Sequence, residues 1–279
     1  MKHEIRNDPQ LGRLLWMTDG NTELAATLDV GIRIIHLSAY GMENLFYRQP
    51  EDLADGLYRP EGWKLIGGHR LWLAPESEKS YFPDQSPVEY KLEDNAVVLT
   101  QSHDLWLGVR KSMRLEFLPN GRIKVRWSFE NLGEHTVRSA LWGINTLQGG
   151  VGVVDFSNSD REPYRPNRSI QLWRDTDLGD ERICFNKDRI AVKFKPGASY
   201  FKIGLYSQRG CIHHENLGQS FDIEFPVFPM EQYPDGGSNI EIWTSRCCME
   251  LEVLGPLVDV KPLESTSFDI FWSVKKLDG

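Results

Sequence analysis

Apolar and polar residues alternate along much of this chain, which is the pattern of strands that bury one face. The clearest alternation covers 122–129, where every second residue is Ile, Val, Trp or Phe. A second alternating run, 113–117, precedes it across the Pro-Asn-Gly sequence at 119–121. Asn-Gly between two such runs favours a tight turn, so the sequence predicts a β-hairpin here.

Similar runs extend the strand prediction over the rest of the chain. They lie at 23–30 and 31–38, a second predicted hairpin, and at 190–194, 221–225, 240–242, 249–253 and 268–274. Helical periodicity is almost absent, and the one helix predicted is a short one at 50–56. Short strands joined by turns, without alternating helices, predict an all-β antiparallel sandwich or barrel. We expect 1–279 to form a single domain of this kind.

The composition narrows the classes of partner. The net charge of −8 and the scattered Lys and Arg residues argue against nucleic acid binding. No stretch approaches the roughly 20 apolar residues of a membrane span, and the charged first residues do not resemble a signal peptide, so we expect a cytoplasmic protein without a membrane partner. Four cysteines form neither a disulfide framework nor a CxxC pattern, and no metal is expected.

Nine Trp residues are the one compositional excess. A flat indole can cover the C–H face of a sugar ring, although large aromatics serve core packing equally well. The segment 155–180, rich in Asn, Asp, Arg and Pro, is long for a connection. It is either a cover over part of a site or a decorated surface loop.

The first segment with candidate chemistry is GGHRLW at 67–72. Two glycines allow a ligand or another backbone to come close, and strand alternation places Arg70 and Trp72 on one face. The pair is either a sugar clamp, with a guanidinium beside a stacking surface, or a cation–π contact that holds a sheet together. His69 points the other way and is the weaker candidate for a sugar contact, since it suits a hydrogen-bonded packing role.

The second segment is YPDGGSNIEIWT at 233–244. Pro-Asp-Gly-Gly is typical of a turn, with Asp235 at its centre. In the strand that follows, Asn239, Glu241 and Trp243 share one face, because successive side chains alternate. This stripe is either a solvated outer face or the polar floor of a ligand site.

The third segment, MELEVLGPL at 249–257, places Glu250 and Glu252 on one face of a strand. If that face lines a groove, repulsion and burial raise at least one pKa toward the range useful for general acid or base catalysis. If it faces water, the pair only aids solubility. His213 and His214 lie in a polar stretch before the Asp-Gly-Gly turn, where one of them could face a ligand.

Taken together, the GGHRLW block, the PDGGSN turn and the MELEVLGPL segment resemble a little-characterised family with the galactose-mutarotase-like β-supersandwich, related at a distance to aldose 1-epimerases. The resemblance implies a carbohydrate-binding groove, a small-molecule sugar as partner and no cofactor. It implies that Glu252 is the catalytic base, with Glu250 as its rival. It also implies that Arg70 binds the sugar, helped by Asp235, Asn239 and Trp72.

The usual general-acid histidine of those enzymes is missing from the comparable stretch, 140–146. Asn145 lies there instead and could bind a sugar hydroxyl. Mutarotation needs an acid for the ring oxygen as well as a base for the C1 hydroxyl. Either His213 or His214 therefore supplies the acid, or the protein binds or senses sugars without interconverting them. A structural partner of sugar-processing enzymes is a third option, resting on fold analogy alone.

Overall fold

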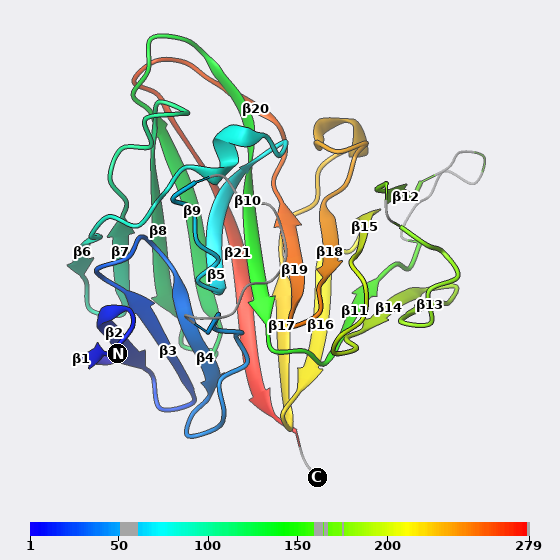
Figure 1. Ribbon diagram of the computed structural model, residues 1–279, viewed down its shortest axis with the longest axis horizontal. Coiled ribbons are helices and arrows are strands. Elements are labelled where there is room, and N and C mark those ends of the chain that lie inside the picture. The colour runs from blue at the N-terminus through cyan, green and yellow to red at the C-terminus, as the bar shows by residue number, and fades with distance from the viewer. Residues whose placement is uncertain (51–60, 159–163, 165–166, 175, 278–279) are drawn as a thin grey trace.

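The predicted strands pair into two large antiparallel sheets that pack face to face (Figure 1). The computed structural model describes residues 1–50, 61–158, 164, 167–174 and 176–277. The helix expected at 50–56 lies, apart from its first residue, outside the described residues. No helix in the part of the chain that the structure describes is long and apolar enough to cross a membrane.

The first sheet contains the strands that will form the site. In order across the sheet they are β1 (Lys2–Asp8), β2 (Gly12–Thr18), β3 (Thr22–Thr27), β4 (Ile34–Ala39), β5 (Gly68–Ala74), β10 (Val137–Leu147), β19 (Met249–Leu254), β18 (Ile240–Thr244), β15 (Phe201–Tyr206) and β12 (Ser169–Leu172), and β20 (Val258–Val260) also pairs with β10.

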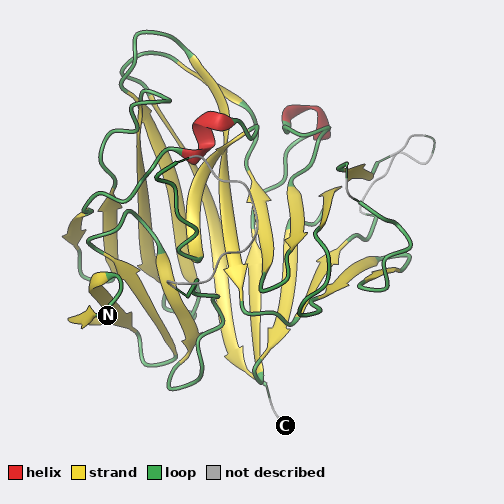
Figure 2. Cartoon of the chain, in the orientation of Figure 1, coloured by secondary structure: helices red, strands yellow, loops and turns green. Residues whose placement is uncertain are grey.

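The second sheet covers the inner face of the first. Its order is β13 (Ile183–Phe185), β14 (Arg189–Lys193), β11 (Val151–Asp155), β16 (Cys211–Asn216), β17 (Gln219–Glu224), β21 (Ser265–Lys276), β9 (Ile123–Asn131), β8 (Val109–Phe117), β7 (Ala96–Thr100) and β6 (Glu89–Leu92). The only helices among the described residues are two short 3₁₀ turns, η1 (Glu78–Tyr81) and η2 (Met230–Gln232) (Figure 2).

The strand predictions are confirmed. The hairpin predicted over 113–129 is β8 with β9, and Gly121 has the positive φ of 77° that its tight turn requires. The second predicted hairpin is β3 with β4. The later runs appear as β14, β17, β18, β19 and β21.

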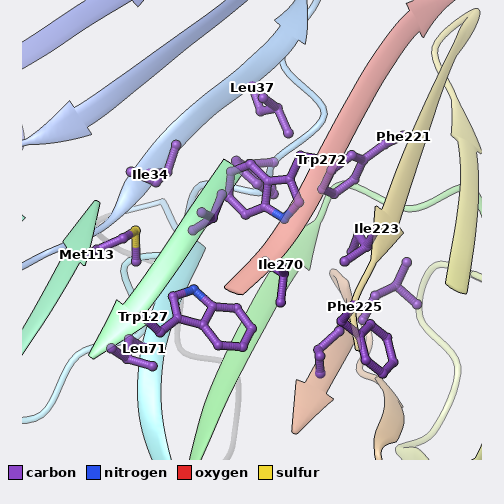
Figure 3. Close-up of a cluster of buried hydrophobic side chains, with 14 of the residues drawn as sticks. Ile34, Leu37, Leu71, Met113, Trp127, Phe221, Ile223, Phe225, Ile270 and Trp272 are labelled. Carbon is purple, nitrogen blue, oxygen red and sulfur yellow. The ribbon is translucent and has the colours of Figure 1, made fainter. Parts of the chain in front are cut away.

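The core lies between the two sheets, where the apolar face of each alternating strand meets the other sheet. In β9 every second residue from Ile123 to Asn131 is buried. Trp127 and Trp272 are the largest fully buried side chains and lie among Ile, Leu and Phe from both sheets (Figure 3). Burial of large aromatic and branched side chains is the main stabilising term for such a sandwich.

Two central strands of the first sheet are buried on both faces. Every residue of β5 and β19 is buried, although a sheet with one solvated face would show alternation. The cause is the segment 61–87, whose Trp63, Leu65 and Tyr81 pack on the outer face against Trp72 and Trp142. This cover converts an outer sheet face into an enclosed site.

The two glycines at the start of β5, one before the strand and one as its first residue, allow close backbone packing. Gly67 and Gly68 have φ of 92° and 70°. A Cβ would lie 2.2 Å from the Tyr47 carbonyl oxygen at Gly67 and 2.3 Å from the Ile34 carbonyl oxygen at Gly68. Of the two roles the sequence left open, the structure shows the close approach of another backbone.

Candidate functional site

A cavity of about 210 Å³ lies on the outer face of the first sheet, over β5, β10, β19 and β18. The antiparallel register determines which side chains meet there: Arg70 is opposite Ile144, Ile144 is opposite Glu252, and Glu252 is opposite Glu241. Residues directly opposite in a sheet project on the same face. The cavity is lined by Leu65, Arg70, Trp72, Glu76, Tyr81, Trp142, Ile144, Lys202, Trp243, Glu250 and Glu252.

Arg70 and Glu250 form a buried ion pair at one side of the cavity. Arg70 Nη1 donates to Glu250 Oε1 at 3.0 Å and to Thr146 Oγ1 at 3.1 Å. The Thr146 hydroxyl in turn donates to the same Glu250 oxygen at 2.8 Å. The guanidinium lies 4.6 Å from the centre of the Trp72 ring. The structure therefore combines the two roles the sequence left open for Arg70, a cation–π contact and a side chain at the cavity.

Lys202 brings a second cation to the site, and sequence reasoning missed it. Its Nζ lies 2.6 Å from Glu241 Oε2 and 3.6 Å from Glu252 Oε2. The signal was present in β15, where Phe201, Ile203 and Leu205 lie in the core and Lys202 falls on the opposite face. The pairing of β15 with β18 cannot be read from the sequence, however, so nothing in the pattern connects that face with Glu241.

Glu241 and Glu252 are carboxyl neighbours directly across β18 and β19. Both side chains are 1% exposed. Burial raises the pKa of Glu241 to about 7, and it raises the pKa of Glu252 well above its usual range, with the neighbouring carboxyls adding to the effect. Two close carboxylates in a buried site do not both ionise readily, so one proton is held between them near neutral pH. Trp142 Nε1 also donates to Glu252 Oε2 at 2.9 Å.

Aromatic rings form the walls of the cavity. Trp72 makes edge-to-face contacts with Trp63, Tyr81 and Trp142, with ring centroids 5.0 to 5.8 Å apart. Trp243 closes another side and stacks on Tyr200 at 5.9 Å. These rings offer flat apolar surface between the polar groups, which is the combination that sugar rings require.

Two further carboxyls near the cluster are less buried: Asp235 is half-buried and Glu76 is exposed. Asp235 has a positive φ of 51° in the predicted turn, which Gly237 closes by donating from its backbone N–H to the Pro234 carbonyl at 2.9 Å. Burial raises the pKa of Asp235, which also interacts with Lys202, Glu241 and Glu76. Asp235 thus adjoins the cluster, whereas Glu76, which accepts a hydrogen bond from the Tyr81 hydroxyl, lines the cavity itself.

Three predicted sugar contacts have other partners. His69 faces the core, where its Nε2 accepts a hydrogen bond from Trp127 Nε1 at 3.1 Å, and burial lowers its pKa to about 3. Asn145 is fully buried and donates to the Leu251 carbonyl at 2.9 Å. Asn239 is fully buried and hydrogen-bonds the backbone of Ser207 in both directions. None of the three lines the cavity, so the structure does not bring them together with Arg70 and Glu252 as the prediction expected.

The structure also places His213 and His214 away from the cavity, contrary to the expectation that one of them faces the ligand. Both lie in β16 of the second sheet, and neither lines the cavity. His213 contacts Asp222 at 2.6 Å and Glu215 at 3.0 Å. His214 is buried, hydrogen-bonds the Gly149 carbonyl at 2.6 Å and has its pKa lowered to about 4 by burial. Their nearness in sequence to the Asp-Gly-Gly turn did not carry over into space, because β17 and η2 intervene.

The long segment 155–180 contributes one described residue near the site. It contains β12, which pairs with β15, and then Trp173, whose ring lies 4.9 Å from Lys202 Nζ. Trp142 lies 5.1 Å from the same ammonium group. The Lys202 cation is thus held between two indoles as well as beside carboxylates.

The two-sheet fold with a pocket on one outer face places this chain in a known structural class. A galactose mutarotase-like protein from Lactobacillus casei superposes with a TM-score of 0.59 at 9% identity, covering 94% of this chain and 99% of that chain. One from Clostridium acetobutylicum gives 0.57 at 11%, covering 99% and 98%. A candidate aldose 1-epimerase from Escherichia coli K12 gives 0.57 at 13%, covering 99% and 100%.

No protein-family profile and no curated protein matches the chain. The structural likeness, at these low identities, is a likeness of fold. It confirms the predicted galactose-mutarotase-like supersandwich fold.

Proposed function

We propose that this protein binds a single aldose in the outer pocket of its first sheet and interconverts the anomers of that sugar. The observation that carries the proposal is the meeting of two differently paired carboxyls, Glu250 and Glu252, in one aromatic-walled cavity. The fold likeness to galactose mutarotase-like proteins supports the same proposal.

The size of the cavity favours a monosaccharide. Sites for drug-sized ligands usually have volumes of about 300–1,000 Å³. The cavity here, about 210 Å³, lies below that range and suits one sugar ring. The indoles of Trp72, Trp142 and Trp243 provide apolar surface for the C–H faces, and the carboxyls and Arg70 provide partners for hydroxyl groups.

Glu252 is the proposed general acid. Sequence reasoning favoured this residue as the base, but its surroundings favour the opposite role. It is buried beside Glu241, and its raised pKa keeps a proton on it near neutral pH. A protonated carboxyl replaces the histidine that the sequence failed to supply.

Glu250 is the proposed general base. Its Oε1 is paired with Arg70 at 3.0 Å and accepts the Thr146 hydroxyl, and all its hydrogen bonds to the described residues use this oxygen. Its Oε2 makes none of these hydrogen bonds and is the atom proposed to accept a proton from the sugar. Acid–base catalysis commonly uses two carboxyls that have different partners in one site.

The proposed reaction breaks the bond between C1 and the ring oxygen. Glu250 takes the proton of the C1 hydroxyl while Glu252 gives its proton to the ring oxygen. The electron pair of the C1–ring oxygen bond leaves with the ring oxygen, and the C1 oxygen forms the carbonyl. Rotation about the C1–C2 bond and reversal of both transfers close the other anomer, so no proton is gained or lost overall.

A second function, sugar binding without turnover, is favoured by two observations. No histidine lines the cavity in the described part of the chain, and every charged group there has an ionic partner or a hydrogen bond. A pocket with its charges already paired can bind a sugar and leave it unchanged.

The two functions are separated by polarimetry. We expect freshly dissolved α-glucose or α-galactose to reach its equilibrium optical rotation faster with the protein than without it. Rates equal to the spontaneous rate, combined with a measured sugar affinity, would refute turnover and support sugar binding as the function. Failure of a panel of aldoses to bind in calorimetry would refute both.

Glu252→Gln tests the acid and Glu250→Gln tests the base. Each is expected to lower the catalysed rate by about 10²- to 10⁴-fold, because each removes one proton transfer. The wild-type rate is expected to fall as the pH rises and Glu252 loses its proton. The matched control is Glu134→Gln, a change at an exposed residue outside the cavity, which should leave the rate unaltered.

A further inference from the structure

Among the residues that the structure describes, the cluster at the pocket has more carboxyl groups than cations. Two cations, Arg70 and Lys202, lie among five carboxyls. Three of these carboxyls line the cavity, Glu76, Glu250 and Glu252, and two adjoin the lining, Asp235 and Glu241. Even with one proton shared by Glu241 and Glu252, the cluster keeps a net charge of about −2 at neutral pH.

Neither cation is available to a new anion. Arg70 is paired with Glu250 at 3.0 Å, and its guanidinium is covered by the Trp72 ring. Lys202 is paired with Glu241 at 2.6 Å and lies between two indole rings. A phosphate or carboxylate on the ligand would have to break one of these buried pairs, which leaves a buried charge without its partner.

The open side of the cavity offers acceptors instead. Glu76 is exposed, lines the cavity and has the Tyr81 hydroxyl as its hydrogen-bond donor. Asp235 is half-buried and close enough for the charge of Glu76 to influence it. Among the described residues, Glu76 has no ion pair of its own, and Lys202, the cation that acts on Glu76 and Asp235, is itself paired with Glu241 at 2.6 Å. A cationic group placed here would meet this negative charge with the ring of Tyr81 beside it.

We infer that the aldose bound in this pocket carries a protonated amino group, as in a 2-amino-2-deoxyhexose, and that Glu76 selects for it. The inference rests on the proposed sugar-binding function. The same charges exclude sugar phosphates and uronic acids. Neutral hexoses fit the aromatic walls but leave the excess negative charge without a partner.

The test compares the affinities of four ligands in calorimetry at neutral pH, where the cluster keeps its net negative charge and most of the amine is protonated. We expect glucosamine to bind at least about tenfold more tightly than glucose, since an opposite charge a few ångströms away in a partly buried site easily supplies that factor. Glucose 6-phosphate and glucuronate should bind at least about tenfold more weakly than glucose. Added salt should shrink both differences.

The selecting residue is tested by Glu76→Gln. The ratio of the glucose and glucosamine dissociation constants should fall toward one in this variant. Glu78→Gln is the matched control, because Glu78 is an equally exposed carboxylate two residues away that does not line the cavity. In Glu78→Gln the ratio of the two dissociation constants should keep its wild-type value.

The outcomes separate the two proposals. Equal binding of glucose and glucosamine, or tightest binding of the phosphate, overturns the amino-sugar inference while the sugar-binding function stands. Binding of none of the four ligands overturns the sugar-binding function itself. A ratio that falls equally in Glu76→Gln and Glu78→Gln, or in neither, overturns the assignment to Glu76.

Discussion

The buried pair Glu241 and Glu252 should make the stability of the protein depend on pH in an unusual direction. Most carboxyls in folded proteins have lowered pKa values, and the protein gains stability as the pH rises through them. Glu241 has a raised pKa, because its burial disfavours the charged form. Its folded state therefore holds a proton that the unfolded state has already lost at pH 5 to 7.

The perturbation is Glu241→Gln, which keeps the shape of the side chain and removes its titration. The pKa of Glu241 rises from 4.5 to about 7 on folding. At roughly 1.4 kcal/mol per pKa unit, this contributes about 3 kcal/mol to the free energy of unfolding. The contribution is fully present below pH 4.5 and is lost as the pH rises through about 7.

The assay is urea unfolding of the wild type and the variant at pH values from 4.5 to 8. We expect the free energy of unfolding of the wild type to fall, relative to the variant, by about 3 kcal/mol over this range. For Glu134→Gln, a change at the surface, the plot of unfolding free energy against pH should run parallel to that of the wild type. Parallel curves for Glu241→Gln as well would refute the raised pKa of Glu241 and the sharing of a proton between Glu241 and Glu252.

Three further changes test the packing that supports the site. Gly143→Ala should lower the free energy of unfolding by more than about 2 kcal/mol in chemical denaturation, because its Cβ would lie 1.9 Å from the Trp127 ring. Arg33→Met should cost about 3–5 kcal/mol in the same measurement at neutral pH, since it leaves the buried Asp84 without its ion partner, 2.7 Å away; a loss under 1 kcal/mol would contradict this. Gly121→Ala should lower the free energy of unfolding by only about 1 kcal/mol, because its φ is positive but nothing lies within 4 Å of the new Cβ. A larger loss would mean that steric contacts, and not backbone strain, determine the cost at this position.

The sequence by itself determined the strands and the faces of their side chains. Because side chains alternate with a period of two, the pattern alone placed Arg70 with Trp72 and Glu250 with Glu252. It also gave the all-β class, since no helical periodicity competes with the alternation. The structure confirms each of these features.

Only the tertiary structure decided which faces meet and what covers them. Alternation says which residues share a face, but it does not say which strands pair, because pairing joins segments far apart in the chain. Lys202 lies beside Glu241 because β15 pairs with β18. His213 is close in sequence to the Asp-Gly-Gly turn but lies in the other sheet.

The covering segment 61–87 made the largest difference. Two carboxyls on an open strand face would be ordinary solvated groups with ordinary pKa values. Packing of Trp63, Leu65 and Tyr81 over that face encloses the cavity and shields Glu252 from water. Desolvation depends on the three-dimensional surroundings of a group, so the chemistry of these carboxyls could be read only from the folded chain.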